Sequence, residues 1–338
     1  MDKPHYVVIG NGPAGHEAAL TLRNNGPHAR VTVVSKERGP SFRSHLLPRY
    51  IAGDLEEKDL FRTSLDAYAD AGITLRCGQQ VVGVNPSKKE IVLDHKEIIS
   101  FTGLIISVGG RPRIPEPLLG VKNLMMTLKT PGDARGWIER LSQTKAVLMA
   151  GGDLTSLALT KALLDLGKKV YFLLDRDAFW PLRCDDALLR EVSSRLVERG
   201  VDVLPDGRIK ALTSLPDGRI RVRIDERELQ VGIFGAFFGL VPHVGFLAGS
   251  GLSIDRGILV NETLNAGFES VFAAGDCAQI YHPGIRDYWV SIGNRNAEEL
   301  GRIAALNLLG AHLQPGISGE SIFDIQGIKA NTSWWLEF

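Results

Sequence analysis

The stretch HYVVIGNGPAGHEAALTLRNNG, residues 5–26, decides the fold of this chain. Its apolar start predicts a short buried strand, its glycines predict a tight turn, and its alanine-rich part predicts a helix that ends near Asn25 and Gly26. The stretch RVTVVSKE, residues 30–37, then supplies a second parallel strand. A strand–helix–strand unit of this length is typical of dinucleotide-binding folds, so the predicted fold class is α/β.

The glycine spacing within this turn suits a phosphate group. Gly10 permits the tight turn, Gly12 lets the backbone approach a pyrophosphate, and Gly15 lets the helix pack closely on the strand. The start of the helix would offer N–H groups and the positive end of its dipole to the phosphates. An acidic group after the second strand would bind a ribose; Ser35 holds that position and Glu37 follows it. An ordinary strand–turn–helix is the alternative.

A second stretch has the same outline and predicts an internal repeat. It reads KAVLMAGGDLTSLALTKALLDLGKKVYFLLDRD, residues 145–177. After each repeat, short β-rich runs alternate with polar turns and lead to a buried closing strand. Each half of the chain therefore follows the same plan.

Composition narrows the classes of function. The 338 residues suffice for two domains, and 39 basic residues balance 39 acidic ones, which argues against nucleic acid or an anionic membrane as a partner. The longest apolar run, IFGAFFGLV from Ile233, is about half the length that spans a bilayer, and no export leader opens the chain. The three cysteines lie too far apart for a redox pair or a thiolate cluster, so we expect no metal and a cytoplasmic location.

Further stretches resemble a known family. IISVGGRPRIP (105–115), GLSIDRGILVNETLNAGFESVFAAGDCAQ (251–279) and NRNAEELGRIAALNLLG (294–310) are similar to segments of FAD-dependent pyridine nucleotide-disulphide oxidoreductases. Rubredoxin reductases, the flavin region of NADH-dependent nitrite reductases and NADH oxidases belong to this group. The resemblance covers nearly the whole chain. It implies two Rossmann-like domains of the three-layer ββα type, with the NAD domain inserted in the FAD domain.

The resemblance also implies boundaries and an FAD site. The FAD domain is expected at 1–112 and 245–322, the NAD(P) domain at 113–244, and a remnant of a third domain at 323–338. Asp276 would face the ribitol or phosphate of FAD, and the helix that starts near Gly293 would favour the reduced flavin through its dipole. The expected FAD-binding residues are Gly10, Gly12, Pro13, Ala14, Gly15, Ser35, Lys36, Glu37, Ser44, Val81, Ser107, Val108, Gly109, Gly275 and Asp276.

The first departure from the family lies in SFRSHLLPRYIAGD, residues 41–54. The NADH oxidases carry a redox-active cysteine here, whereas this chain has His45. Imidazole forms no mixed disulfide, so thiol chemistry at this position is excluded. His45 remains a candidate proton donor near the flavin, with a polar contact to FAD or simple packing as alternatives.

The second departure lies in the second glycine turn. The expected NAD-binding residues are Gly151, Gly152, Asp153, Ser156 and Asp175. Asp153 stands where the family has glycine, and a carboxylate there would repel a pyrophosphate unless a shift of register points it outward. Ala158 replaces a family glutamate. Asp175 follows the strand as a ribose partner should, which favours NAD over NADP, although Arg176 weakens that preference.

The third departure is the stretch FDIQGIKANTSWWLEF, residues 323–338. It resembles only the first strand of the family's C-terminal domain. Trp334 and Trp335 are expected either to pack back on the protein or to dock a partner subunit.

The predicted activity is that of an FAD-dependent oxidoreductase acting between NAD(H) and an iron–sulfur protein or subunit, within a larger complex. Because the chain has no cysteine cluster, that iron–sulfur partner must be separate. Two alternatives stay open: a free-standing NADH oxidase or small-acceptor reductase, and an electron-transfer subunit whose nicotinamide site has decayed.

Overall fold

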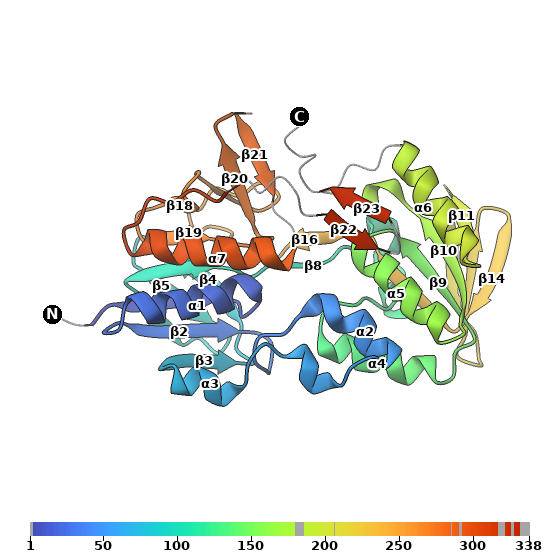
Figure 1. The fold of residues 1–338 in the computed structure, drawn as a ribbon, viewed down its shortest axis with the longest axis horizontal. Helices are drawn as coiled ribbons and strands as arrows, with labels where there is room; N and C mark the ends of the chain where they lie inside the picture. The colour runs from blue at the N-terminus through green and yellow to red at the C-terminus, as the bar shows by residue number, and fades with distance from the viewer. Residues whose placement is uncertain are drawn as a thin grey trace. The chain divides into compact units, whose positions relative to one another are not determined.

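The computed structural model describes residues 3–179, 186–205, 207–284, 286–290 and 293–316, together with two strands beyond them. The chain forms two compact units (Figure 1). Unit 1 comprises Met1–Arg43, Phe61–Arg111 and Val241–Ile317, and unit 2 comprises Ser44–Leu60, Pro112–Leu240 and Ser318–Phe338. The short strands β8 (Gly110–Pro112) and β16 (Leu240–Pro242) lie where the chain passes between them.

Unit 1 is built on a six-stranded sheet in which every pairing except β18–β19 is parallel. The strand order is β18-β19-β7-β1-β2-β3, so the chain moves outward from β1 on one side and returns at β7 on the other. This reversal makes the carboxyl ends of β1 and β7 the switch point at which such sheets bind ligands. The strands are β1 (His5–Ile9), β2 (Arg30–Ser35), β3 (Ile73–Cys77), β7 (Gly103–Ile106), β18 (Asn265–Phe268) and β19 (Val271–Ala273).

Two helices lie side by side on this sheet, α1 (Pro13–Asn25) and α7 (Asn294–Leu308) (Figure 1). Helix α1 begins with a proline at its first position, where no N–H is needed, and is followed by its C-cap residue, Gly26. The two helices touch at Gly301, because a β-carbon there would lie 2.1 Å from the backbone oxygen of Ala14. Glycine therefore sets the distance between the helices.

We expect Gly301→Ala to destabilise the folded protein by about 3 kcal/mol, since the added methyl group meets backbone and not a movable side chain. The measurement is the free energy of unfolding in urea. Gly245→Ala in the same unit is the control, because a β-carbon at Gly245 would meet nothing within 4 Å. Equal stability of the two variants would contradict the packing seen at Gly301.

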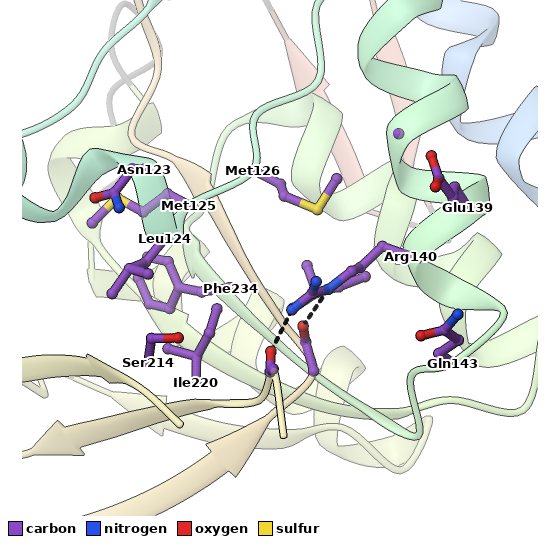
Figure 2. Close-up of a pocket in the computed structure, with 14 residues that line it drawn as sticks. Asn123, Leu124, Met125, Met126, Glu139, Arg140, Gln143, Ser214, Ile220 and Phe234 are labelled. Atoms are coloured by element: carbon purple, nitrogen blue, oxygen red, sulfur yellow. Dashed lines mark hydrogen bonds between the residues drawn. The ribbon is translucent and has the colours of Figure 1, made fainter. Parts of the chain in front are cut away.

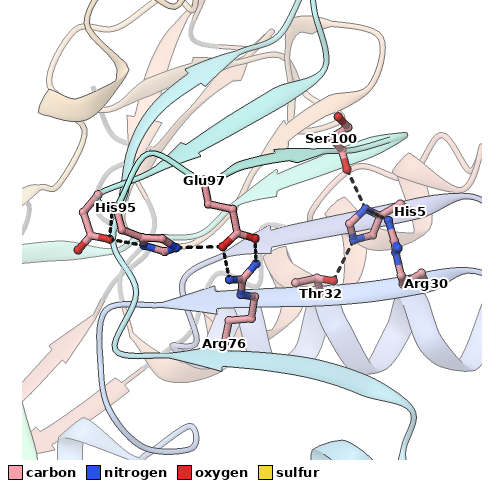
Figure 3. A network of polar contacts seen from close by, with 8 residues as sticks. His5, Arg30, Thr32, Arg76, His95, Glu97 and Ser100 are labelled. Atoms are coloured by element: carbon pink, nitrogen blue, oxygen red, sulfur yellow. Dashed lines mark hydrogen bonds and ion pairs between the residues drawn. The ribbon is translucent and has the colours of Figure 1, made fainter.

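Smaller elements complete unit 1, and polar networks join some of them to the sheet. His5 on β1 lies 2.7 Å from the Ser100 oxygen on β6 and 2.8 Å from Thr32 Oγ1 on β2 (Figure 3). Arg76 at the end of β3 donates two 2.6 Å hydrogen bonds to Glu97, which holds the pKa of Glu97 down to about 2. The elements are α3 (Leu65–Asp70), β4 (Val81–Asn85), β5 (Glu90–Leu93), β6 (Ile98–Ser100), η5 (Gly245–Leu247), β17 (Ile258–Val260), β20 (Ala278–His282) and β21 (Asp287–Val290).

Unit 2 repeats the plan with a four-stranded parallel sheet in the order β11-β10-β9-β15. An apolar core between this sheet and a three-stranded antiparallel meander contains Phe234, Val222 and Leu148. The strands are β9 (Ala146–Gly151), β10 (Lys169–Leu174), β11 (Asp202–Pro205), β15 (Ile233–Phe237) and, in the meander, β12 (Ile209–Ser214), β13 (Ile220–Ile224) and β14 (Arg227–Val231).

The helices of unit 2 are α2 (Leu47–Ala52), α4 (Pro131–Leu141), α5 (Leu154–Asp165) and α6 (Asp186–Glu198). Short 3-10 turns are η1 (Ser44–Leu46), η2 (Glu57–Leu60), η3 (Glu116–Leu124) and η4 (Arg176–Phe179). Strands β22 (Ile322–Ile325) and β23 (Ile328–Asn331) pair as an antiparallel hairpin.

The predicted α/β class and the doubled dinucleotide-binding plan are confirmed. The units differ from the predicted boundaries at residues 44–60, which were assigned to the FAD domain but group with unit 2, because α2 packs on α4 and α5. Unit 1 resumes at Val241 instead of residue 245 and ends at Ile317. Trp334 and Trp335 lie outside the described residues, so their predicted docking role stays a prediction.

No helix within the described ranges combines the length and the apolar character that crossing a bilayer requires.

Candidate functional site

The first glycine turn joins β1 to α1 and explains each of its glycines. Gly10 has a φ of +100°, and a β-carbon there would lie 2.4 Å from the Ser107 oxygen. A β-carbon at Gly15 would lie 1.9 Å from the Gly10 oxygen. Gly12 differs, because its φ of −73° suits any residue and a β-carbon there would meet nothing within 4 Å. The protein itself does not require glycine at position 12; a ligand approaching the start of α1 would.

Most predicted FAD residues gather at one edge of the unit 1 sheet. Four neighbouring strands end there, β19, β7, β1 and β2, and the predicted residues follow each of them directly. They are Gly10, Gly12, Pro13, Ala14 and Gly15 after β1; Ser35, Lys36 and Glu37 at the end of β2; Ser107, Val108 and Gly109 after β7; Gly275 and Asp276 after β19. Val81 begins β4 and is buried.

The end of β2 presents a carboxylate to solvent, as a ribose partner should. Ser35 is buried and its hydroxyl donates to Glu37 Oε2 at 3.1 Å. The backbone oxygen of Glu37 accepts from Gly78 at 2.9 Å, which fixes the segment, and Glu37 itself is exposed. Lys36 is exposed beside it.

Four buried polar atoms lack a hydrogen-bond partner within the part of the chain that the structure describes, and all four belong to unit 1. They are Asn11 Nδ2, Ser41 Oγ, Arg62 Nε and Gln79 Oε1. Asn11 follows β1, Ser41 follows β2 and Gln79 follows β3, so three of them lie beyond the carboxyl ends of adjacent strands. Buried polar groups are nearly always paired, so these four atoms are available to a polar ligand.

None of these four residues was predicted from the sequence. Asn11 could have been noticed, since it stands inside the glycine turn. Ser41, Arg62 and Gln79 carry no sequence signal, because their burial depends on contacts between distant segments: Arg62, for example, pairs with Glu298 on α7 at 2.5 Å.

His16 on α1 lies next to this group and is held neutral. Its burial and the neighbouring Arg62 lower its pKa to about 4, against a smaller opposing effect of Glu298. An unfolded chain would protonate His16 near its ordinary pKa of about 6.5. The stability that this histidine contributes is therefore present above pH 6.5 and is lost as the pH falls toward 4.

We expect the free energy of unfolding to fall between pH 6.5 and 4 by an amount on the order of 2 kcal/mol that is traceable to His16, after allowance for the partly exposed ring. Urea unfolding of the wild type and of His16→Gln at both pH values measures it. The variant should lose less stability over this interval. The same loss in both proteins would show that His16 does not titrate as its surroundings require.

Asp276 and Cys277 follow β19. Asp276 is half-buried after Gly275. Cys277 is fully buried, its thiol lies 3.4 Å from the Ala274 oxygen and 3.5 Å from the Ile106 oxygen, and burial raises the pKa of the thiol to about 11. Such a thiol is not reactive at neutral pH, so Cys277 contributes to packing beneath the sheet edge.

The second glycine turn, between β9 and α5, copies the first. Gly151 has a φ of +119°, and a β-carbon there would lie 1.9 Å from the Phe237 oxygen at the end of β15. Gly152 follows, and the Asp175 backbone N–H donates to the Gly151 oxygen at 2.7 Å. Gly151 therefore faces β15 as Gly10 faces the end of β7, and the turn again lies at a switch point of its sheet.

Asp153 caps helix α5. Its carboxylate accepts from the Ser156 backbone N–H at 2.9 Å, while the buried Ser156 hydroxyl donates to the Asp153 backbone oxygen at 2.6 Å. The side chain thus turns back onto the start of the helix. A bound pyrophosphate would otherwise accept hydrogen bonds from the backbone N–H groups there. Burial raises the pKa of Asp153 to about 7, although backbone N–H groups and Lys129 oppose the shift. The carboxyl is therefore partly protonated near neutral pH.

The remaining predicted residues of unit 2 are placed as follows. Asp175 directly follows β10 and is half-buried. Arg176 forms an ion pair with Asp186, which occupies the guanidinium that would otherwise favour a 2′-phosphate. Ser44 and the exposed His45 form η1, which groups with unit 2, and their roles stay predictions.

A cavity of about 510 Å³ in unit 2 contains none of the predicted site residues (Figure 2). It is lined by Met125, Met126 and Phe234, and Arg140 donates across it to the backbone oxygens of Gly232 and Gly218. It lies at the start of β15, which is the amino edge of the parallel sheet, whereas the glycine turn lies at the carboxyl edge. Within the described ranges, no three His, Cys, Asp or Glu side chains gather as a metal would require.

Comparison with known proteins agrees with this architecture. Residues 4–294 match the sequence profile of the pyridine nucleotide-disulphide oxidoreductases. Putidaredoxin reductase from Pseudomonas putida is 27% identical over 321 residues, covering 90% of this chain and 74% of that protein. An NADH oxidase from Enterococcus faecalis is 25% identical over 312 residues, covering 89% and 70%. The crystal structure of the covalent putidaredoxin reductase–putidaredoxin complex matches with a TM-score of 0.87 at 24% identity, over 97% of this chain and 81% of that one.

The fold and the two glycine turns define an oxidoreductase with two dinucleotide-binding domains. The chain belongs to the pyridine nucleotide-disulphide oxidoreductase family, an enzyme family that depends on FAD and NAD(H). The predicted family, enzyme class and cofactors are thereby confirmed.

Proposed function

We propose that this chain is an NADH-dependent flavoprotein reductase that passes electrons to a separate iron–sulfur protein. The observation that carries the proposal is the pair of glycine turns, one at the switch point of each sheet, with open space at Gly12 and, within the described ranges, a buried Asn11 Nδ2 that has no hydrogen-bond partner. The similarity to putidaredoxin reductase supports the choice of acceptor.

The residues of unit 1 would bind and orient FAD. Gly12 and the start of α1 would hold the diphosphate, Glu37 would accept from the adenosine ribose, and Asp276 would accept from ribitol hydroxyls or face the phosphate. In unit 2, Gly151 and Gly152 would face the NADH pyrophosphate and Asp175 its ribose. FAD supplies the conversion from two-electron to one-electron transfer. The balanced reaction takes one NADH and two oxidised one-electron acceptors to NAD⁺, a proton and two reduced acceptors.

The finer parts of the proposal concern the partner. Because the chain has only three scattered cysteines, the iron–sulfur centre resides on another protein or subunit. A place in a larger complex, with docking through Trp334 and Trp335, is part of the proposal, as is a cytoplasmic location. His45, which is exposed in η1, would be a proton donor.

A second candidate is electron transfer without NADH, which Asp153 favours. Its carboxylate already accepts an N–H at the start of α5, and Ala158 replaces the glutamate that the family resemblance implies. A third is an NADH oxidase or small-acceptor reductase, supported by the similarity to the enzyme from Enterococcus faecalis.

Anaerobic titration of the FAD-loaded protein with NADH, followed at the visible absorption band of the flavin, separates these possibilities. Bleaching at stoichiometric NADH supports the reductase. A protein that dithionite bleaches but NADH does not would support the second candidate. Under NADH turnover, rapid reduction of an added ferredoxin but slow consumption of oxygen supports the protein acceptor over the oxidase.

A further inference from the structure

Asn11 stands between Gly10 and Gly12 in the first glycine turn, yet its side chain is not turned to solvent. The residue is 6% exposed. Its Oδ1 accepts a 2.6 Å hydrogen bond from the Tyr68 hydroxyl on α3, whereas its Nδ2 is buried and has no partner within the described part of the chain. One half of the amide is therefore fixed and the other half is left as a buried donor.

A chain of hydrogen bonds fixes the direction of this amide. The Tyr68 hydroxyl lies 2.6 Å from both Asn11 Oδ1 and His16 Nδ1. A hydroxyl has one proton to donate, so if it donates to Asn11 it must accept from His16. His16 is neutral at pH 7, since burial and Arg62 lower its pKa to about 4, and its single ring proton then resides on Nδ1. His16 therefore donates to Tyr68, and Tyr68 donates to Asn11. Within the described residues, this arrangement leaves the two protons of Asn11 Nδ2 without an acceptor.

A buried donor without an acceptor destabilises a protein, so such a group in a native fold calls for a missing partner. Tyr68 is 2% exposed and its ring meets His16 edge-on at 5.4 Å, so the arrangement is tightly packed and cannot easily turn the amide elsewhere. The turn around Asn11 is the one whose Gly12 leaves open space at the start of α1. The start of a helix and an unpaired N–H donor both favour a negatively charged ligand, so an anion suits this site.

We propose that Asn11 is a side-chain ligand of the diphosphate of FAD, and that Tyr68 and His16 are positioning residues that aim its amide. This inference rests on the proposed FAD site in unit 1. It extends that site beyond the backbone of the glycine turn to the side chains of Asn11 and Tyr68, whose hydrogen bond joins α3 to the turn.

The test measures FAD binding to the apoprotein by flavin fluorescence, with ADP as a competing probe that carries the diphosphate but no flavin. We expect Asn11→Ala to raise the dissociation constants of FAD and of ADP by the same factor, about tenfold. Tyr68→Phe should raise both by a smaller factor. The double variant should equal Asn11→Ala alone, because the hydroxyl acts only through the amide. Asn25→Ala is the matched control: it lies at the far end of α1, donates to the Thr21 oxygen at 2.9 Å, and should leave both constants unchanged.

Stability of the apoprotein separates a ligand from a packing residue. Asn11→Ala should unfold in urea at about the wild-type concentration, since removal of the unpaired Nδ2 donor offsets the loss of the acceptor of Tyr68, whose hydroxyl can donate to His16 Nδ1 once the ring proton moves to Nε2. If Asn11→Ala does not fold, the test rests on Tyr68→Phe alone. A dissociation constant of FAD equal to that of the wild type would then overturn the inference.

Other results would also overturn it. A wild type that binds one FAD while Asn11→Ala binds FAD equally well would refute the role of Asn11 and leave the proposed function standing. Weaker binding of FAD but not of ADP would place the effect on the flavin half and refute the contact with the diphosphate. A wild-type apoprotein that takes up no FAD would refute both the inference and the proposed function.

Discussion

Replacement of Asp153 by asparagine should make this protein bind NADH at least about tenfold more tightly above pH 7, equivalent to about 1.4 kcal/mol. The Asp153 side chain accepts the Ser156 N–H at the start of α5, which is where the pyrophosphate of a nicotinamide nucleotide would bind. When ionised, this carboxylate repels the phosphates. Asparagine keeps the shape and caps helices as well as aspartate does, so the variant changes the charge and little else.

The same interaction predicts a pH dependence in the wild type. Because the pKa of Asp153 is raised to about 7, the carboxyl is neutral below that pH and charged above it. The dissociation constant of NADH should therefore rise with pH above 7, by up to about tenfold per pH unit, while that of Asp153→Asn stays level. Titration of the protein with NADH across this range gives both curves.

Asp133→Asn is the control for these measurements. Asp133 lies in the first turn of α4, in the same unit, and its carboxylate belongs to the capping box of that helix and not to the start of α5. Its replacement should leave NADH binding as it is. If the wild type and Asp153→Asn have equal dissociation constants at every pH, the charge of Asp153 does not face the nucleotide and the second turn works in another way.

Gly12→Ala should abolish useful FAD binding without unfolding the protein. The backbone at Gly12 suits alanine and the new methyl group would meet no protein atom within 4 Å, so the apoprotein should keep its stability to within about 0.5 kcal/mol. The methyl group would instead occupy the space through which the diphosphate approaches the start of α1. We expect the dissociation constant of FAD to rise at least about a hundredfold, or about 2.7 kcal/mol.

Gly15→Ala provides the contrast. A β-carbon there would lie 1.9 Å from the Gly10 oxygen, so this variant should lose fold stability together with FAD binding. Measuring the unfolding of the apoproteins and the binding of FAD in parallel separates the two effects. Normal FAD binding by Gly12→Ala would mean that the diphosphate does not pass over this turn.

Much of the fold could be predicted because its signals are local. The spacing of Gly10, Gly12 and Gly15 and the apolar strands around them lie within a few tens of residues, and the second turn repeats them. Residues 44–60 were predicted in the FAD domain, whereas they group with unit 2 because α2 packs on α4 and α5, which are distant in sequence. Local pattern contains no information about such contacts.

The site was predictable in part for the same reason. The repulsion expected from Asp153 followed from its place in the turn, but its role as a helix cap and its raised pKa depend on how the side chain folds back and how deeply it is buried. The hydrogen bonds from His16 through Tyr68 to Asn11 connect α1, α3 and the turn. No residue spacing in the sequence predicts them.

The sheet of unit 1 has a consequence for biosynthesis. Strand β1 leaves the ribosome before the segment Pro112–Leu240, but β19 and α7, which complete the sheet, follow β1 by more than two hundred residues, and Gly301 of α7 then packs against Ala14. The segment Pro112–Leu240 emerges between them and carries its own parallel sheet. The inserted segment can therefore fold before the nucleotide turn after β1 has acquired the neighbouring strand β19 and helix α7. Cofactor loading would then follow the synthesis of the inserted segment, and a nascent chain halted before β19 should not retain FAD.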